Sequence, residues 1–289
     1  MNELTYFVTG ASGQLGRVAV SLLASRNLRV IAGARDPQKV EDLTALGVEV
    51  RHCDYDQPDT VFQALEGVDR VLLVSSSEVG KRTTQHRAVI DAARARNVSL
   101  VAYTSILQAA TSPLILASEH KATEEMLAES GIPHVLLRNA WYSENFQMGV
   151  PMALEHGAVY TAAGSGRFSP ATRQELAEGA VAALTAPVTE QQTIYELAGS
   201  SSFSMPELAA TLSLRSGRKI ECVNMAEGDY AAMLKNVGVP AVFADILAQS
   251  EVMAEQGAHC DEGRALERLI GRAPLALADL VDQWIAPTS

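Results

Sequence analysis

Positive charge is scarce in this chain, which has 23 Lys and Arg residues against 34 Asp and Glu residues and a formal net charge of −11. A protein that binds nucleic acid needs a basic face for the phosphates, so this balance predicts no nucleic-acid partner. Long apolar runs are missing too, because no stretch approaches the roughly 20 residues of a membrane-spanning helix. We therefore also expect no membrane partner.

Cysteine is rare, and the three cysteines, at positions 53, 222 and 260, form no CxxC motif. This spacing indicates neither a disulfide framework nor a zinc site, and we expect no bound metal. Isolated thiols favour a reducing compartment. The N-terminus runs straight into strand-like TYFVT without the features of a signal peptide, so we expect a cytoplasmic protein. Paired carboxylates and a Ser/His/Asp arrangement, which would indicate a hydrolase, are also missing.

What the first half does contain is a regular alternation of strand-like and helical stretches. The strand-like runs lie at 5–9, 29–34, 49–53, 70–75, 100–105 and 134–139, with single helical stretches between them. This order predicts βαβ units, a parallel sheet and right-handed crossovers. Near-continuous apolar strands fit a sheet that helices cover on both faces.

The expected fold is therefore α/β, with a doubly wound parallel sheet of the Rossmann, short-chain dehydrogenase type and a smaller C-terminal α/β lobe. We place the dinucleotide-binding Rossmann domain at 1–140 and the substrate-side lobe at 141–289, with about 171–199 returning to the sheet. Ligands of such sheets bind at the carboxyl ends of the strands, and we expect the lobe to close over those ends.

The stretch TGASGQLG places Gly10, Gly13 and Gly16 between a predicted strand and a predicted helix, which is the context that a dinucleotide loop requires. The first glycine permits the tight turn, the second lets backbone approach a pyrophosphate, and the third lets the helix pack on the strand. The helix N-terminus attracts the phosphates. The loop residues expected to bind the cofactor are Gly10, Ser12, Gly13, Gln14 and Leu15.

The end of the second strand indicates which nucleotide is bound, because an NAD-specific protein wants a carboxylate there for the ribose 2′-hydroxyl. Here the strand ends in GARDPQK, so Arg35 stands at that place and Lys39 follows one helical turn later. A guanidinium fork suits a 2′-phosphate. We expect NADPH (NADP+) as cofactor, with Asp36 capping the helix that Pro37 begins; the alternative for Arg35 is a solvated turn residue.

Polar residues at the ends of the next strands complete the predicted cofactor site. Asp54, with Tyr55 beside it, could accept hydrogen bonds from the adenine amino group. The run after the fourth strand, Ser75, Ser76 and Ser77, would lie near the middle of the cofactor. The run after the fifth strand, Tyr103, Thr104 and Ser105, would lie beside the nicotinamide. For the serines, simple turn chemistry is an equal alternative.

Several stretches together resemble the NmrA-like branch of the atypical short-chain dehydrogenases, and within it the zinc-free bacterial NAD(P)H:quinone oxidoreductases and triphenylmethane reductases. These stretches run through most of the chain, and the most specific is LRNAWYSENF (137–146). The resemblance implies an NADPH-bound fold that passes hydride to quinone-like acceptors. It also implies that WYSENF contributes to the acceptor pocket, through Trp141, Tyr142, Asn145 and Phe146; the alternative is that they are core aromatics.

One part of the family pattern is missing. Ordinary short-chain dehydrogenases carry Tyr-x-x-x-Lys on the helix after the fifth strand, where the tyrosine is the acid and the lysine lowers its pKa. The corresponding positions here hold Leu116 and His120, and Lys121 is one place off, about 100° around the helix. His120 would contact the nicotinamide ribose or have a structural role. The usual proton relay is therefore absent.

This absence favours electron-poor acceptors over ketones. Ketone reduction forms an alkoxide, which needs a strong proton donor, whereas a hydroquinone anion has a phenol-like pKa of roughly 10. Proximity and orientation would then supply most of the catalysis. Candidate catalytic residues are Tyr103 and Tyr142 as proton donors and Asn139 as the group that orients the acceptor carbonyl, unless Asn139 only caps its strand.

The sequence thus predicts an NADPH-dependent reductase of quinones or similar electron-poor conjugated acceptors. The alternative of a redox-sensing, NADP(H)-binding regulator without turnover remains open, because Leu116 and His120 occupy the positions of the catalytic Tyr and Lys. Reduction of cationic triphenylmethane-type dyes is a third reading, within enzymes. The small-molecule acceptor is the expected partner, and a homodimer is left open.

Overall fold

The computed structural model describes residues 4–286, and the chain divides into two units. The first unit contains the chain up to Ala109 together with Ser118–Asn139 and Arg173–Glu196. The second contains Ala110–Ala117, Ala140–Thr172 and the chain from Leu197 onward. Both units are therefore assembled from stretches that are separate in the sequence.

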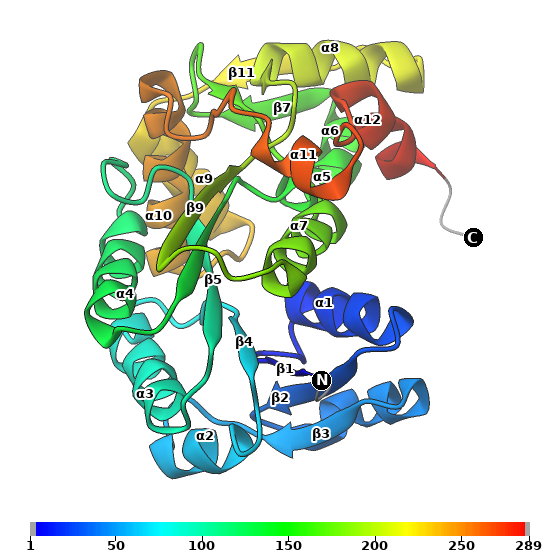
Figure 1. Cartoon of the computed structure of the whole chain (residues 1–289). Coiled ribbons are helices and arrows are strands. Elements are labelled where there is room, and N and C mark those ends of the chain that lie inside the picture. The colour runs from blue at the N-terminus through cyan, green and yellow to red at the C-terminus, as the bar shows by residue number, and fades with distance from the viewer. Residues whose placement is uncertain (1–3, 287–289) are drawn as a thin grey trace. The chain divides into compact units, whose positions relative to one another are not determined.

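A seven-stranded sheet lies at the centre of the first unit (Figure 1). Its strands are β1 (Thr5–Val8), β2 (Arg29–Ala34), β3 (Glu49–His52), β4 (Arg70–Leu73), β5 (Leu100–Ile106), β6 (His134–Asn139) and β9 (Gln192–Leu197). They lie in the order β3-β2-β1-β4-β5-β6-β9, and the pairings among β1 to β6 are parallel. The strand order reverses at β1, between β2 and β4, which is where sheets of this type bind ligands. The doubly wound sheet predicted from the sequence is confirmed.

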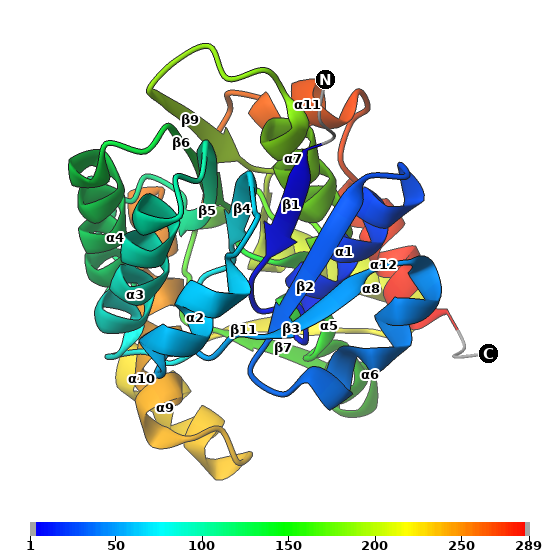
Figure 2. The ribbon, with the colours of Figure 1, turned by 60° about the horizontal axis from the view of Figure 1, so that its bottom comes forward.

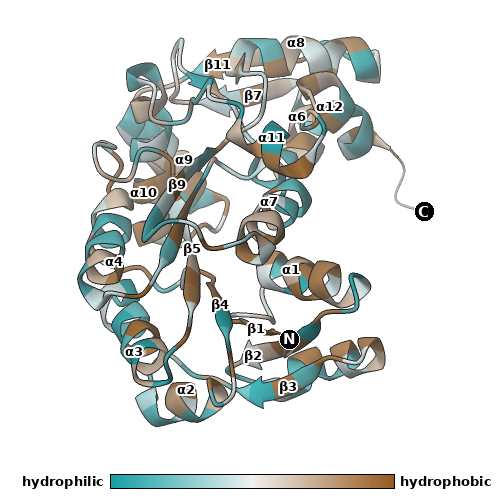
Figure 3. Ribbon diagram, viewed as in Figure 1, coloured by the Kyte–Doolittle hydropathy of each residue, from teal (hydrophilic) through white to brown (hydrophobic). Residues whose placement is uncertain are grey.

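Helices cover both faces of this sheet. On one face α1 (Gln14–Ser25) packs against α7 (Arg173–Thr185), and the other face carries α2 (Pro58–Ala64), α3 (Arg82–Ala95) and α4 (Ala117–Ser130), as two views show (Figure 1, Figure 2). Figure 3 shows hydrophobic residues along β5, whereas α4 carries mostly hydrophilic ones. Burial of strand side chains from two sides explains why these strands read as near-continuous apolar runs.

A buried arginine ties α7 to the sheet from a distant part of the sequence. Arg70, at the start of β4, is 8% exposed, and its Nη1 donates to the carbonyl oxygens of Leu184 (2.6 Å) and Ala186 (2.7 Å). These carbonyls lie at the C-terminal end of α7, where the last turn of a helix leaves carbonyls without partners. A cation there is also favoured by the helix dipole.

The segment after β2 folds as a 3-10 helix, η1 (Pro37–Leu46), rather than as the ordinary helix that its pattern suggested. Only Val40 and Leu43 of this segment are buried, and a spacing of three residues matches the three residues per turn of a 3-10 helix. The Asp36 side chain caps it by accepting from the Gln38 N–H at 3.2 Å, as predicted.

The second unit has its own core. Phe146 packs edge-on against Phe168 and Phe203, with ring centroids 5.2 Å apart in both pairs. Ser204 and Glu207 form a capping box at the start of α8. The elements are α5 (Ser143–Gln147), α6 (Val150–His156), β7 (Ala158–Thr161), β8 (Arg167–Phe168), β10 (Phe203–Ser204), α8 (Met205–Ser216), β11 (Glu221–Asn224), α9 (Glu227–Asn236), α10 (Ala241–Val252), η2 (Met253–Gln256), α11 (Ala265–Ile270) and α12 (Leu277–Ile285). Strand β11 pairs parallel with β7, and β10 pairs antiparallel with β8.

Within residues 4–286, no helix is long and apolar enough to cross a membrane. The same residues contain no group of three or more His, Cys, Asp or Glu side chains placed to hold a metal ion. Cys53, Cys222 and Cys260 are all free thiols. Burial raises the pKa of the Cys53 thiol to about 12, so this cysteine is kept in its neutral form.

Candidate functional site

The glycine loop after β1 has the backbone geometry of a phosphate cradle. Gly10 has a φ of +58°, and the Gly13 N–H donates to its carbonyl at 2.9 Å, which closes the turn. A Cβ on Gly16 would lie 2.4 Å from the Gly10 carbonyl oxygen, so this position accepts only glycine without displacement of the loop. Helix α1 begins at Gln14, and its first N–H groups have no acceptor within the helix.

The loop surface and the loop support are different residues. Ser12, Gly13 and Gln14 are exposed, whereas Leu15 is 5% exposed and belongs to the core. An anion at this helix N-terminus would therefore meet backbone N–H groups and small or polar side chains. The structure places all five predicted loop residues on one turn, and Leu15 is the one that anchors it.

Tyr55 supports the glycine loop through hydrogen bonds at the ends of the neighbouring strands. Its hydroxyl lies 2.5 Å from Thr9 Oγ1 and donates to the Val74 carbonyl at 2.9 Å, while the Val74 N–H donates to Thr9 Oγ1 at 2.9 Å. Burial raises the pKa of the Tyr55 phenol, so the hydroxyl stays protonated as a donor. These contacts join the ends of β1, β3 and β4. The predicted cofactor residue Tyr55 thus holds the cradle in place.

The predicted adenine residue, Asp54, follows β3. Its Oδ1 accepts from the Asp56 N–H at 3.1 Å, and its Oδ2 accepts from the Gln57 amide at 2.8 Å. A carboxylate oxygen has more than one acceptor site, so each oxygen keeps capacity for a ligand donor. The structure therefore places an ordered carboxylate at this strand end.

Arg35 lies at the carboxyl end of β2 with its side chain 67% exposed, and its Nη1 is 2.9 Å from Glu78 Oε1. Lys39, one turn further on, is exposed as well. Arg35 is thus a solvated guanidinium at the carboxyl end of β2, which fits the 2′-phosphate hypothesis and equally the alternative of a solvated turn residue. The carboxylate that meets it was not foreseen from the sequence.

The serine run after β4 is held by its backbone. The Ser75 N–H donates to Thr104 Oγ1 at 2.8 Å, and the Ser76 N–H donates to His86 Nε2 at 3.0 Å. Ser77 is exposed. Thr104, a predicted cofactor residue, is 3% exposed and therefore positions this loop from β5.

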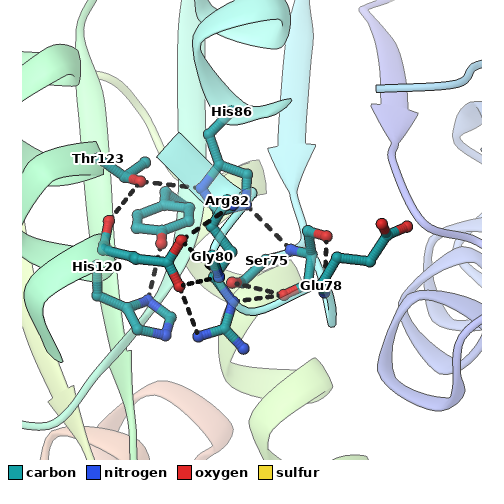
Figure 4. A network of polar contacts seen from close by, with 10 residues as sticks. Ser75, Glu78, Gly80, Arg82, His86, His120 and Thr123 are labelled. Carbon is teal, nitrogen blue, oxygen red and sulfur yellow. Dashed lines mark hydrogen bonds and ion pairs between the residues drawn. The ribbon is translucent and has the colours of Figure 1, made fainter. Parts of the chain in front are cut away.

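His86 is locked in one neutral tautomer. Its Nε2 accepts from the Ser76 N–H, so the ring proton is on Nδ1, which lies 2.9 Å from Thr123 Oγ1 (Figure 4). The Thr123 hydroxyl in turn donates to the Glu119 carbonyl at 2.9 Å. Burial, reinforced by the Arg82 charge, lowers the pKa of His86 to about 3. The histidine is therefore a fixed acceptor that ties the loop after β4 to α3 and α4.

The helix α3 receives its N-terminal cap from α4. Both carboxylate oxygens of Glu119 lie 3.1 Å from the Gly80 N–H, and Oε1 also accepts from the Arg82 N–H at 3.1 Å. A carboxylate at this place satisfies free N–H groups and complements the helix dipole. The Arg82 side chain folds back, and its Nε donates to the Ser76 carbonyl at 2.6 Å.

Tyr103 and His120 form a buried pair beside this loop. The Tyr103 hydroxyl is 2.8 Å from His120 Nδ1, and the two residues are 0% and 6% exposed. Burial, followed by the charge of Arg82, lowers the pKa of His120 to about 3, and burial raises the pKa of the Tyr103 phenol. His120 occupies the lysine position of the family pattern and lies inside, whereas Lys121 is exposed. Figure 4 shows His120 next to Arg82.

The remaining predicted residues of the first unit lie at the ends of β5 and β6. The Ser105 hydroxyl donates to Glu124 Oε1 at 2.6 Å, within a cluster in which Arg138 binds Glu124 (2.7 Å) and Glu196 (2.9 Å). Ser105 is therefore engaged in the protein interior. Asn139 is 5% exposed, and its Oδ1 has no hydrogen-bond partner in the part of the chain that the structure describes. A buried acceptor of this kind calls for a ligand or water donor.

The aromatic segment predicted to bind the acceptor belongs to the second unit. Trp141 meets the His259 ring edge-on at 5.3 Å, and Tyr142 forms an isolated parallel bridge with Ala171. Trp141, Tyr142 and Asn145 are all partly exposed. Phe146 is 9% exposed and packs in the core described above, which is the alternative that the sequence left open for it.

Sequence reasoning missed the residues that hold the loop after β4. They are Arg82, His86, Glu119 and Thr123. The contacts of Glu119 and Thr123 with this region join residues 37 to 39 positions apart, so no local pattern announces them. The sequence offered only an indirect signal, namely polar residues on α4 and a run of serines after β4.

The fold is a doubly wound sheet whose first strand is followed by a turn that requires glycine at Gly16 and then by a helix N-terminus. An arginine stands after the second strand. Together these features define a dinucleotide-binding protein. The sequence profile of the NAD(P)H-binding family matches residues 10–187. The chain belongs to this family.

Relatives of known function cover nearly the whole chain. It is 46% identical over 276 residues to quinone oxidoreductase 2 of Escherichia coli, covering 95% of this chain and 96% of that protein. The crystal structure of the NADPH-dependent quinone oxidoreductase of Escherichia coli with NADPH superposes with a TM-score of 0.92, at 46% identity, over 96% of this chain and 99% of that one. The triphenylmethane reductase of Citrobacter sp. with NADP(H) gives a TM-score of 0.91 at 36% identity, over 97% and 100% of the two chains.

Proposed function

We propose that this protein is an NADPH-dependent reductase that transfers hydride directly to quinones or similar electron-poor conjugated acceptors. The observation that carries the proposal is the cradle, in which Gly10 has a φ of +58° and a Cβ on Gly16 would collide with backbone, combined with Arg35 at the end of β2. The relatives support both the cofactor and the acceptor, since two of them are known with NADPH or NADP(H) and one of these is a quinone oxidoreductase.

The residues of the first unit fit this cofactor. The backbone from Ser12 to Leu15 offers N–H groups to a pyrophosphate, Arg35 a guanidinium to the 2′-phosphate, and Asp54 an acceptor to the adenine. Gly10, Gly13, Tyr55 and Thr104 hold these groups in place. For the central part of the site we propose Ser75, Ser76 and Ser77 on the loop after β4, and for the nicotinamide part His120 on α4. Ser105 is instead engaged with Glu124 in the interior. When bound, the cofactor supplies the hydride.

The reduction of a quinone does not need a strong proton donor from the protein. A quinone that has accepted hydride is a hydroquinone anion with a phenol-like pKa of roughly 10, so water can protonate it. We assign Tyr103 to positioning, because its hydroxyl contacts His120 in the interior. Tyr142 is kept as a proton donor and Asn139 as the residue that orients the acceptor. Trp141, Tyr142 and Asn145 remain our proposed acceptor-binding residues, whereas Phe146 packs in the core of the second unit.

The function is tested by following NADPH absorbance with benzoquinones, naphthoquinones, triphenylmethane dyes and simple ketones. Quinones should oxidise NADPH, and ketones should react at least about 100-fold more slowly, because a positioned general acid is worth that much for an alkoxide and the Tyr and Lys positions are empty. NADPH binding with no oxidation by any acceptor would replace the enzyme by an NADP(H)-sensing regulator. Faster turnover of dyes than of quinones would make the dye reductase the better description.

Replacing Tyr103 by phenylalanine tests the positioning role. The variant leaves the buried Nδ1 of His120 without its partner, so the KM for NADPH should rise several-fold while kcat with a good quinone stays within about threefold. Steady-state kinetics at saturating quinone give both constants. Tyr160→Phe, at an exposed position on β7, is the matched control and should change neither.

A loss of about 100-fold or more in kcat, with KM unchanged, would instead identify Tyr103 as the proton donor.

For partners and location we propose a small-molecule acceptor only, without nucleic acid, in the cytoplasm. The charge of −11 opposes phosphate binding outside the cofactor loop, and three free cysteines fit a reducing compartment. A homodimer is compatible with the chain.

A further inference from the structure

The carboxylate of Glu78, on the loop that follows β4, lies between the cations of Arg35 and Lys81. Its Oε1 is 2.9 Å from Arg35 Nη1 and its Oε2 is 2.8 Å from Lys81 Nζ. Lys81 is also 3.8 Å from Asp56. Figure 4 shows Glu78 on the same loop as Ser75 and Gly80, with its carboxylate pointing away from His86 and His120.

The topology gives this ion pair its meaning. Arg35 follows β2 and Glu78 follows β4, and these are the two neighbours of β1 in the sheet. The glycine loop follows β1 itself, so the Arg35–Glu78 contact joins loops on both sides of the cradle. While it is paired with Glu78, the Arg35 guanidinium is held toward the β4 side.

The charges are fixed at neutral pH. Hydrogen bonds from Lys81 and then Arg35 lower the pKa of the Glu78 carboxyl, so it is ionised, and arginine is always protonated. The side chains are well exposed, at 67% for Arg35, 60% for Lys81 and 32% for Glu78. Exposed pairs of this kind are weak and break readily.

We propose that Glu78 sets the cofactor preference by competing with the 2′-phosphate for Arg35; this inference rests on NADPH being the cofactor. A 2′-phosphate carries more charge than a carboxylate and binds a guanidinium fork in two places, so it displaces Glu78. Lys81 then becomes available as a second cation. A nucleotide without the 2′-phosphate leaves the Arg35–Glu78 pair intact. Glu78 thus weakens NADPH binding and hastens its release, while it leaves NADH binding unchanged.

The test is the variant Glu78→Gln, with dissociation constants for NADPH and NADH measured by fluorescence titration at low ionic strength. The NADPH constant should fall about fivefold, which corresponds to about 1 kcal/mol, and the NADH constant should stay within twofold. Glu49→Gln is the matched control, because it removes one charge from the exposed Glu49–Arg51 pair. Glu49 is the first residue of β3, at the end of that strand away from Asp54. It should change neither constant.

A double variant checks that the effect passes through the guanidinium. In an Arg35→Ala background, Glu78→Gln should no longer strengthen NADPH binding. An unchanged or weaker NADPH affinity in the single variant would overturn the proposal, and so would an equal change for both nucleotides. If the unmodified protein binds neither nucleotide, the proposed function itself fails; if it binds NADPH and Glu78→Gln has no effect, only this inference fails.

Discussion

Gly16→Ala should lower the affinity for NADPH by about 100-fold or more. The added Cβ would lie 2.4 Å from the Gly10 carbonyl oxygen and 3.2 Å from the Ala11 Cα, both of them backbone atoms that cannot rotate away. Either α1 moves off the strand or the turn opens, and both movements take the N–H groups away from the pyrophosphate. Overpacking of this kind also costs roughly 1–3 kcal/mol of folding stability.

The two effects are separated by measuring NADPH binding by calorimetry and unfolding by thermal denaturation on the same samples. Gly228→Ala is the matched control, because a Cβ at that position in α9 meets nothing within 4 Å. It should leave both binding and unfolding nearly unchanged. A Gly16→Ala protein that binds NADPH normally would mean that the cofactor does not rest on this loop.

Arg35→Ala should weaken NADPH binding by about 30-fold and NADH binding by no more than threefold. A hydrogen bond to a charged group contributes about 1.5–3 kcal/mol, and every 1.4 kcal/mol is a factor of ten in affinity. Because the side chain is 67% exposed, its removal should leave the fold intact. The loss should shrink at high salt, since exposed charges are screened.

Arg29→Ala controls for the change in charge, since Arg29 is an exposed residue at the opposite end of the same strand, β2. Titrations of NADPH and NADH with both variants give the comparison. Equal losses for the two nucleotides in Arg35→Ala, or no loss at all, would show that the 2′-phosphate is bound elsewhere.

Most of the sheet could be predicted because its signals are local. Each strand of the first half is a short apolar run bounded by a turn, and Asp36 before Pro37 announces a helix start by itself. The glycine loop is likewise contained within a few residues. Such features can be recognised in the sequence without knowledge of the tertiary structure.

The parts that escaped prediction depend on partners far along the chain. Tyr103 was a candidate proton donor beside the nicotinamide, but its ring packs in the core with side chains of α3 and its hydroxyl contacts His120, 17 residues later. The pairing of β11 with β7 joins Cys222 to Val159, and neither strand announces the other. The start of η1 at Pro37 was predicted, whereas its 3-10 winding was not.

The arginine under α7 has a consequence for how the chain folds. Arg70 is synthesised early, yet its acceptors at Leu184 and Ala186 appear more than a hundred residues later, and β9 ends at Leu197. A nascent chain that has reached β6 therefore carries a sheet with one face incompletely covered and one edge unpaired. Closing so long a loop is entropically costly and slow, and contacts of this sequence separation are made late. The first unit is completed only after the ribosome has passed residue 197, so the early strands wait for their covering helix in a state that exposes apolar surface.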